Sequence, residues 1–393
     1  MWGETKLRGV RRMRRSRRVR TFAVAITVLI TVALTAAGSA RAQSSVDTRK
    51  VRAVRGIDTI ECTDGTLGRL VGLALPSVAV RDPSMVVALR AHLKERLEGQ
   101  TVVVEASAAG FVIRLVRSGP SIAVSALSAG FGVLGSGLDV EAVAVADEAT
   151  ALVAAANVAQ SRRAGWFAPP PPVVTDAFQA GAVVGLARDG AAANVFRSVR
   201  RAGLRSAVVF ADGVDVRALR DAARAAANAG IELLVVASDA ASDAASDAAF
   251  VDLVDAAEAG GVARLAFPPG ADAAATARRL RLAQARYRGR VGLVGDGADA
   301  SVGGAAFTVV LAGTPTAISG AEAPRAALPR FVVEKASRDR RVPVADWATS
   351  IGDARGLYVR FAATVYPALA GTDAPPDPRL RALADLKLGE GGR

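Results

Sequence analysis

From residue 175 onwards, short apolar segments alternate with segments that have the composition of helices. The apolar segments are AVVGLA, SAVVFA, IELLVVA, VARLAF, RVGLVG and AFTVVLA. Helices are expected between them near 191–202, 216–229, 250–259 and 271–285. Strands that are apolar on both faces must be covered on both sides, which is typical of parallel sheets flanked by helices. The pattern predicts an α/β sandwich with a central, mostly parallel sheet.

The sequence before this part has a different rhythm. Short strand-like segments (KVRAV, DTIECT, GRLVGLAL, QTVVVEAS and FVIRLV) are separated by glycine-rich turns, with helices expected at 82–97 and 147–163. Five short strands with two helices favour a small Greek-key barrel of the OB type. The run WFAPPPPVV is a stiff spacer, because consecutive prolines fit neither a helix nor a central strand. The predicted fold class is therefore two domains, a small OB-like β-barrel with helices at 43–168 and the α/β sandwich at 175–393, joined by a linker at 169–174.

The first 42 residues have the order of a secretory signal. A basic block, KLRGVRRMRRSRRVR, precedes an apolar run and the small-residue site Ala40-Arg41-Ala42. This order predicts a signal peptide at 1–42 and export to the periplasm or the extracellular space. The apolar run at 22–37 is short for a spanning helix, and an uncleaved N-terminal membrane anchor is the alternative.

Charge and cysteine content constrain function less than the totals suggest. Of the net formal charge of +13, ten Lys or Arg and one Glu in residues 1–42 account for +9, which leaves +4 for the mature chain. Nucleic-acid binding therefore cannot be argued from net charge. The single cysteine, Cys62, excludes an intramolecular disulfide.

The segment before the prolines resembles the staphylococcal, or thermonuclease, family of OB-fold nucleases. The resemblance is carried by VRGIDTIEC, GRLVGLALPSVA and ALVAAANVAQSRRAGWF in that order. It implies cleavage of nucleic acids with Ca²⁺, with Asp58 and Thr59 at vestigial metal-ligand positions and Arg69 as a phosphate-binding arginine. The remaining family positions are replaced here by Gly56, Ala74, Ser77 and Phe111.

These replacements remove the chemistry that the resemblance implies. Ca²⁺ is the one cofactor that the resemblance implies. A single carboxylate binds a hard cation poorly, so the set of Ca²⁺ ligands is incomplete. The family's general base falls on Ser77, which cannot serve as one at neutral pH. For Asp58, the alternative is a turn residue that accepts backbone N–H groups.

The second part resembles the phospholipase D-like phosphodiesterases. The resemblance is carried by the helix-to-strand step Ala229-Gly230-Ile231-Glu232-Leu233 and by the turn GGAAFT at 303–308. The family motif H-x-K-x-x-x-x-D supplies a nucleophilic histidine, a phosphate-binding lysine and an orienting aspartate. One alignment places Arg288 at the histidine position and Arg290 at the lysine position, and Asp296 then comes one residue after the aspartate position.

The other alignment of this motif places Asp296 correctly but puts Gly289 and Val291 on the first two positions. Neither alignment has a nucleophile, because arginine stays protonated. Arg288, Arg290 and Asp296 are thus vestigial matches. Arg288 and Arg290 are expected to bind phosphate, and the alternative is that they are strand-edge arginines in water.

Together these resemblances imply an exported pseudoenzyme in which both phosphodiesterase sites are degenerate, and which binds nucleic acid or another phosphodiester as a scaffold. A homodimer through the second domain is a further candidate partner, and membrane contact is expected only through an uncleaved signal. The alternatives are a residual metal-dependent phosphodiester hydrolase, either a nuclease or a phospholipase D-like enzyme, and a periplasmic solute-binding module.

Overall fold

The computed structural model describes residues 46–107, 110–135, 146–185, 192–211, 215–237, 247–295, 304–312, 328–334, 343–350 and 354–360, with residues 379, 382, 383 and 386. Residues Asp47–Arg393 form one compact unit. The predicted signal peptide at 1–42 lies outside the described residues, so export stays a prediction. In the described part of the chain, no helix is both long and apolar enough to cross a membrane.

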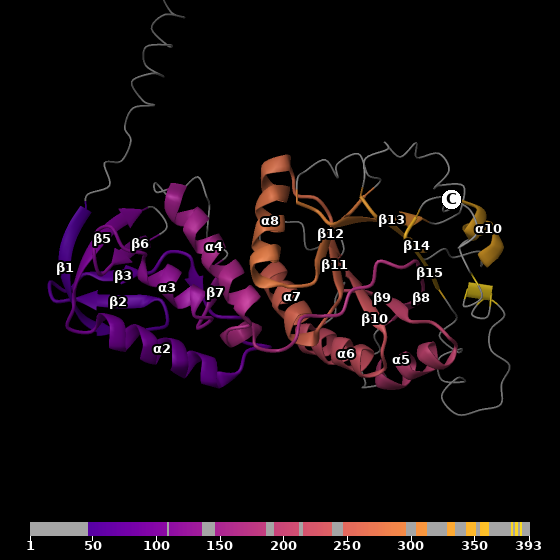
Figure 1. Ribbon diagram of the computed structural model, residues 1–393, viewed down its shortest axis with the longest axis horizontal. Helices are drawn as coiled ribbons and strands as arrows, with labels where there is room; N and C mark the ends of the chain where they lie inside the picture. The colour runs from indigo at the N-terminus through magenta and orange to yellow at the C-terminus, as the bar shows by residue number, and fades with distance from the viewer. Residues whose placement is uncertain are drawn as a thin grey trace, which may run out of the picture. The chain divides into compact units, whose positions relative to one another are not determined.

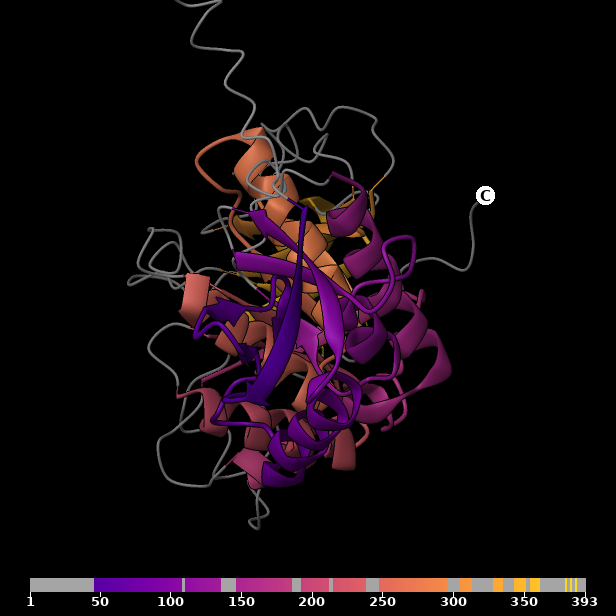
Figure 2. The same ribbon diagram turned by 90° about the vertical axis from the view of Figure 1, so that its left-hand side faces the viewer.

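The N-terminal region contains a five-stranded sheet with the order β3-β2-β1-β5-β6. Its strands are β1 Val46–Val54, β2 Thr59–Cys62, β3 Leu67–Arg69, β5 Thr101–Ser107 and β6 Gly110–Arg114. Two short strands, β4 Leu73–Ala74 and β7 Val133–Leu134, form a separate pair. The helices are α2 Pro83–Leu97, α3 Ile122–Ser128, α4 Ala146–Arg162 and the short 3-10 helix η1 Gly165–Phe167. Helix α2 lies below the sheet in both Figure 1 and Figure 2.

Helix α2 begins and buries its apolar side for reasons that are visible in its sequence. The Asp82 carboxylate accepts a hydrogen bond from the Ser84 backbone N–H at 2.8 Å, and a proline occupies the first turn. Leu89, Leu93 and Leu97 recur every four residues and are fully buried. They join the core beneath the five-stranded sheet.

After the proline segment, eight parallel strands close into a barrel. Every neighbouring pair is parallel, and the last strand pairs with the first, with Tyr358 opposite Gly181. The strands are β8 Gln179–Val184, β9 Ser206–Phe210, β10 Glu232–Val236, β11 Arg264–Phe267, β12 Arg290–Val294, β13 Phe307–Ala312, β14 Arg330–Glu334 and β15 Gly356–Arg360. Closed parallel strands with helices between them define a (β/α)8 barrel.

Helices cover the outer face of the barrel strands. They are α5 Ala192–Arg201, α6 Val216–Asn228, α7 Asp247–Gly260, α8 Ala273–Arg286 and α10 Val344–Ser350 (Figure 1). Successive residues of each barrel strand point to opposite faces of the sheet, so the strands contribute to two separate cores. One core packs the outer strand faces against the helices, and the other fills the barrel interior with side chains such as Val208, Leu234 and Phe331.

The predicted fold class, an OB-like barrel followed by an α/β sandwich, is wrong because the parallel sheet closes on itself. Apolar strands that alternate with helices look the same in sequence whether the sheet is open or closed. Six strands were expected after the linker, whereas the structure adds β14 and β15. These two strands complete the barrel, because β14 pairs with β15 and β15 pairs with β8, the first strand after the prolines.

Individual elements were predicted more accurately than the architecture. The helices expected at 82–97, 147–163 and 216–229 are confirmed as α2, α4 and α6, with ends that differ by one residue. The proline run is confirmed as a segment without helix or strand between η1 and β8.

Candidate functional site

The carboxyl ends of the barrel strands meet at one rim, because all eight strands run in the same direction. Phe210, Val294 and Leu311, near the ends of β9, β12 and β13, are only partly buried members of the interior cluster. Val236 and Val333, close to the ends of β10 and β14, are fully buried beside them. This end of the barrel, called the mouth below, therefore carries apolar side chains that are partly accessible. Active sites of barrel enzymes lie at this end of the strands.

Arg360 brings a positive charge to this mouth. It is the last residue of β15, two residues after Tyr358, whose side chain lies in the barrel interior. Side chains alternate along a strand, so Arg360 points to the same side as Tyr358. Its guanidinium carbon lies 5.3 Å from the centroid of the Phe210 ring. This distance is within the range of a cation–π contact.

The carboxylate nearest to Arg360 along the sheet is already engaged. Glu334 is 4% exposed and forms an ion pair with Arg379 at 3.1 Å. Its other oxygen accepts the backbone N–H of Arg360 at 2.7 Å, and the Arg360 Nε donates to the Glu334 backbone carbonyl at 3.2 Å. Within the described residues, no carboxylate pairs with the Arg360 guanidinium. The mouth thus presents a fixed cation beside an aromatic ring.

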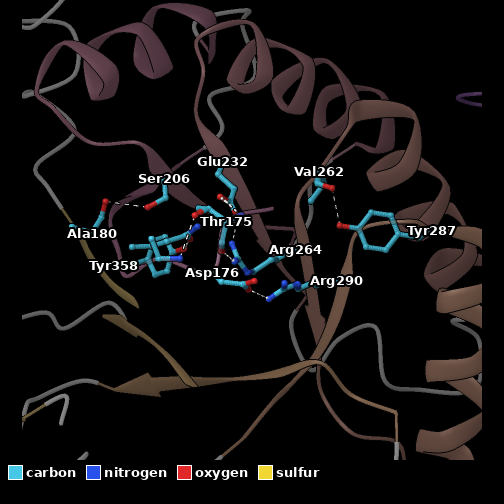
Figure 3. A network of polar contacts seen from close by, with 12 residues as sticks. Thr175, Asp176, Ala180, Ser206, Glu232, Val262, Arg264, Tyr287, Arg290 and Tyr358 are labelled. Atoms are coloured by element: carbon cyan, nitrogen blue, oxygen red, sulfur yellow. Dashed lines mark hydrogen bonds and ion pairs between the residues drawn. The ribbon is translucent and has the colours of Figure 1, made fainter. Parts of the chain in front are cut away.

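The amino end of the barrel is closed by a polar network (Figure 3). Arg264 on β11 forms an ion pair with Glu232 on β10 and donates to the Thr175 carbonyl of the segment before β8. Glu232 also accepts the Thr175 backbone N–H at 3.2 Å. Arg290, the first residue of β12, pairs with Asp176 and holds the pKa of that carboxyl below its usual range.

Tyr358 extends this network into the barrel interior. Its hydroxyl donates to Gln179 Oε1 at 2.5 Å, and the hydroxyl of Ser206 donates to the Ala180 carbonyl at 3.0 Å. Burial raises the pKa of Tyr358 to about 12, so the hydroxyl stays protonated at neutral pH. Burial also lowers the pKa of Arg264. Residues at the amino end of a barrel serve stability. Arg264, Glu232 and Arg290 fasten the segment before β8 to the barrel.

The structure brings together the three residues predicted from the N-terminal resemblance. Asp58 accepts hydrogen bonds from the Thr59 hydroxyl at 2.9 Å and from the Arg69 Nε at 2.6 Å. Arg69 is 73% exposed at its side chain. Both Asp58 oxygens are thus engaged within the protein, and the described residues contain no group of three or more His, Cys, Asp or Glu side chains that could hold a metal ion. Phosphate binding by Arg69 stays a prediction.

The residues predicted from the second resemblance lie away from the carboxyl mouth. The Arg288 side chain is 7% exposed and pairs with Glu258 at 2.6 Å. It also donates to the Phe167 and Pro169 carbonyls at 2.7 Å each, which anchors the proline segment. Arg290 belongs to the polar network at the opposite end of the barrel, and Asp296 lies outside the described residues. The guanidinium of Arg288 is therefore occupied by partners within the chain.

No protein-family model and no curated protein matches this chain. Several solved structures match part of it. A thiamine phosphate pyrophosphorylase from Pyrococcus furiosus is 12% identical, and the match covers 53% of this chain and 96% of that chain with a TM-score of 0.34. An orotidine 5'-phosphate decarboxylase from Pyrococcus horikoshii is 12% identical, and the match covers 52% of this chain and 97% of that chain with a TM-score of 0.36. A 4-hydroxy-2-oxoglutarate aldolase matches at 12% identity over 52% and 92%, with a TM-score of 0.34. At these values the likenesses carry no function, and the barrel assignment rests on strand pairing.

The resemblances to thermonucleases and to phospholipase D-like phosphodiesterases are wrong, because the second part of the chain is a closed barrel of eight parallel strands, an architecture that neither resemblance implies. The pattern Ala229–Leu233 does mark a helix-to-strand step, from α6 to β10, but every β/α unit contains such a step. The predicted function, an exported pseudoenzyme with two degenerate phosphodiesterase sites, is wrong with them. The predicted partners and cofactor stay untested.

Sequence reasoning missed Arg360. The segment GLYVR alternates with the period of a strand and ends in a charged residue, which is the signal that could have identified it. Its position at the mouth depends on β15 closing the barrel, and a pattern within five residues cannot show this.

Proposed function

We propose that the carboxyl mouth of the barrel binds a small organic anion with a carboxylate or phosphate group, and that any chemistry of this protein takes place there. The observation that carries the proposal is the Arg360 guanidinium, which stacks over Phe210 at 5.3 Å without a described carboxylate partner. A cation held against apolar walls binds an anion more strongly than the same cation in water, because the local dielectric constant is lower. Arginine also suits planar carboxylate and phosphate groups, to which it can donate two parallel hydrogen bonds.

The apolar residues of the mouth narrow the ligand class further. Phe210, Val294 and Leu311 offer a surface that favours an organic body over a fully hydrated inorganic ion. Small-molecule sites combine such walls with few polar anchors. The expected ligand is therefore an anion that carries a compact carbon skeleton.

The test is titration calorimetry of the purified chain with benzoate, phenyl phosphate and inorganic phosphate. We expect the organic anions to bind and Arg360→Met to weaken them roughly 10- to 100-fold, because hydrogen bonds to charged groups contribute about 1.5–3 kcal/mol. Arg360→Lys should keep part of the affinity, since it retains the charge but loses the planar donor pair.

Arg52→Met is the matched control, because Arg52 is an exposed arginine in the N-terminal sheet. It should bind the anions as the unchanged protein does. Equal affinity in Arg360→Met and Arg52→Met, or no binding of any organic anion to the unchanged protein, would contradict the proposal. Circular dichroism of each variant establishes that the fold is retained.

A further inference from the structure

A second hollow lies near the amino end of the barrel, away from the mouth. It is a cavity of about 1350 Å³ between α2, η1, the proline segment and the beginning of β8 to β10. Its volume exceeds the several hundred Å³ typical of small-molecule pockets. The cavity is therefore large enough for a ligand of substantial length.

The wall of this cavity is largely apolar. Aromatic side chains approach it from three different elements, namely Phe131 after α3, Trp166 on η1 and Phe178 before β8. Leu204 and Ile231, which precede β9 and β10, add aliphatic surface. The prolines at 169–172 also line the cavity. An apolar ligand body would replace water against these surfaces.

Two residues that line the cavity each carry a buried hydrogen-bond donor without an acceptor. Gln179 is 5% exposed, and its Oε1 is fixed by the Tyr358 hydroxyl at 2.5 Å, while its Nε2 has no partner. The indole Nε1 of Trp166 is likewise buried and unpaired. Both residues line the same cavity. An unsatisfied buried donor costs about 1–3 kcal/mol, and each such group calls for an explanation.

The two glutamates on the wall cannot supply the missing acceptors. Both Glu232 oxygens are engaged, by Arg264 and by the Thr175 N–H. Both Glu258 oxygens are engaged by Arg288. Arg205 adds an exposed guanidinium to the wall. Arg224 adds a second exposed cation, and the remaining carboxylate of the wall is Asp82, which caps α2. The charged groups left to a ligand are thus two cations and one carboxylate.

We propose that this cavity binds an amphipathic carboxylate of fatty-acid size. The apolar body lies against the aromatic and proline residues of the wall. The side chains of Gln179 and Trp166, whose donor atoms are buried in this structure, turn toward the cavity, and the carboxylate oxygens accept hydrogen bonds from Gln179 Nε2 and Trp166 Nε1. A ligand of this kind satisfies the buried donors and complements the positive charge of Arg205. The site is separate from the anion site at Arg360 and does not depend on it.

The experiment is calorimetric titration of the full chain with dodecanoate, with dodecyltrimethylammonium as the probe of opposite charge. We expect dodecanoate to bind and the cation not to bind. Trp166→Phe keeps the ring and removes the donor, and Gln179→Glu keeps the acceptor for Tyr358 and removes the donor. Each should weaken dodecanoate binding about tenfold or more, which corresponds to the loss of one hydrogen bond to a charged group.

Trp347→Phe is the matched control, because Trp347 Nε1 is also buried and unpaired but lies on α10 and does not line the cavity. It should bind dodecanoate as the unchanged protein does, and so should Arg360→Met. Equal binding of the two alkyl probes, equal affinity in Trp166→Phe and Trp347→Phe, or loss of binding in Arg360→Met would overturn the proposal. Melting curves with and without dodecanoate provide a second readout for any variant of lowered stability.

Discussion

At the scale of single residues, helix caps are the features that follow most directly from the sequence. Ser121 is 2% exposed, and its hydroxyl accepts the Val124 backbone N–H at 3.1 Å at the start of α3. We expect Ser121→Ala to lower the free energy of unfolding by about 1 kcal/mol, because the hydrogen bond that caps the first turn of the helix is lost. Urea denaturation measures this change. Ser125→Ala, inside the same helix, should have a smaller effect, and an equal loss in both would show that the cap is unimportant.

Asp82 gives the pH dependence that belongs to this scale. The Ser84 backbone N–H holds the pKa of the Asp82 carboxyl below its usual value. The unfolded chain therefore binds a proton at a higher pH than the folded chain does. The stabilisation is present above the unfolded pKa and is lost as the pH falls through the folded pKa. Asp82→Asn should reduce the fall in melting temperature on acidification below pH about 4, and an unchanged pH profile would contradict the assignment.

At the scale of elements, β12 and β13 depend on a close contact inside the barrel. A Cβ at Gly292 would lie 2.6 Å from ring atoms of Phe307, on the strand paired with it. We expect Gly292→Ala to destabilise the protein by about 1–3 kcal/mol, because the interior must shift to accept one methyl group. The measurement is chemical denaturation followed by circular dichroism.

Gly185→Ala is the control for this contact, since a Cβ there meets nothing within 4 Å. It should leave stability nearly unchanged. Adding Phe307→Leu to Gly292→Ala should recover part of the loss, because the shorter side chain frees space. If Gly292→Ala alone proves as stable as the unchanged protein, the packing of these two strands is looser than the structure shows.

At the scale of the whole molecule, one buried ion pair connects the barrel helices to the N-terminal region. Arg286 on α8 and Asp255 on α7 are 1% and 0% exposed at their side chains and are paired at 2.6 Å. Arg286 also donates to the Leu134 carbonyl, and Asp255 accepts the Ser77 backbone N–H at 2.6 Å. The contacts cross from α7 and α8 to β7 and the segment before α2.

We therefore expect the compact unit to unfold in a single transition, with tryptophan fluorescence and circular dichroism coinciding. Asp255→Ala should cost about 3–5 kcal/mol, because it leaves the Arg286 charge buried without a partner. Asp252→Ala, on the same helix but only partly buried, is the control and should cost much less. Two separate transitions in the unchanged protein would contradict this expectation.

The sequence by itself determined the local elements of this protein. Helix α2 has an aspartate cap, a proline in its first turn and leucines at a spacing of four, so its bounds were predictable to one residue. The apolar runs of β9 and β10 identified these strands in the same way. Propensity, capping and hydrophobic period act between residues close in the chain, and a single sequence shows them directly.

Only the tertiary structure decided that the sheet closes and which charged residues share a site. Pairing of β15 with β8 joins Tyr358 to Gly181, far apart in the chain, and no local pattern separates a closed sheet from an open one. The arginines show the same limit, because the ion pairs of Arg288 with Glu258 and of Arg290 with Asp176 depend on residues far away in the chain. Phosphate binding by these two arginines stays a prediction. Arg360 became a candidate only when closure placed it over Phe210. An arginine's role depends on distant partners and burial, and folding alone brings these together.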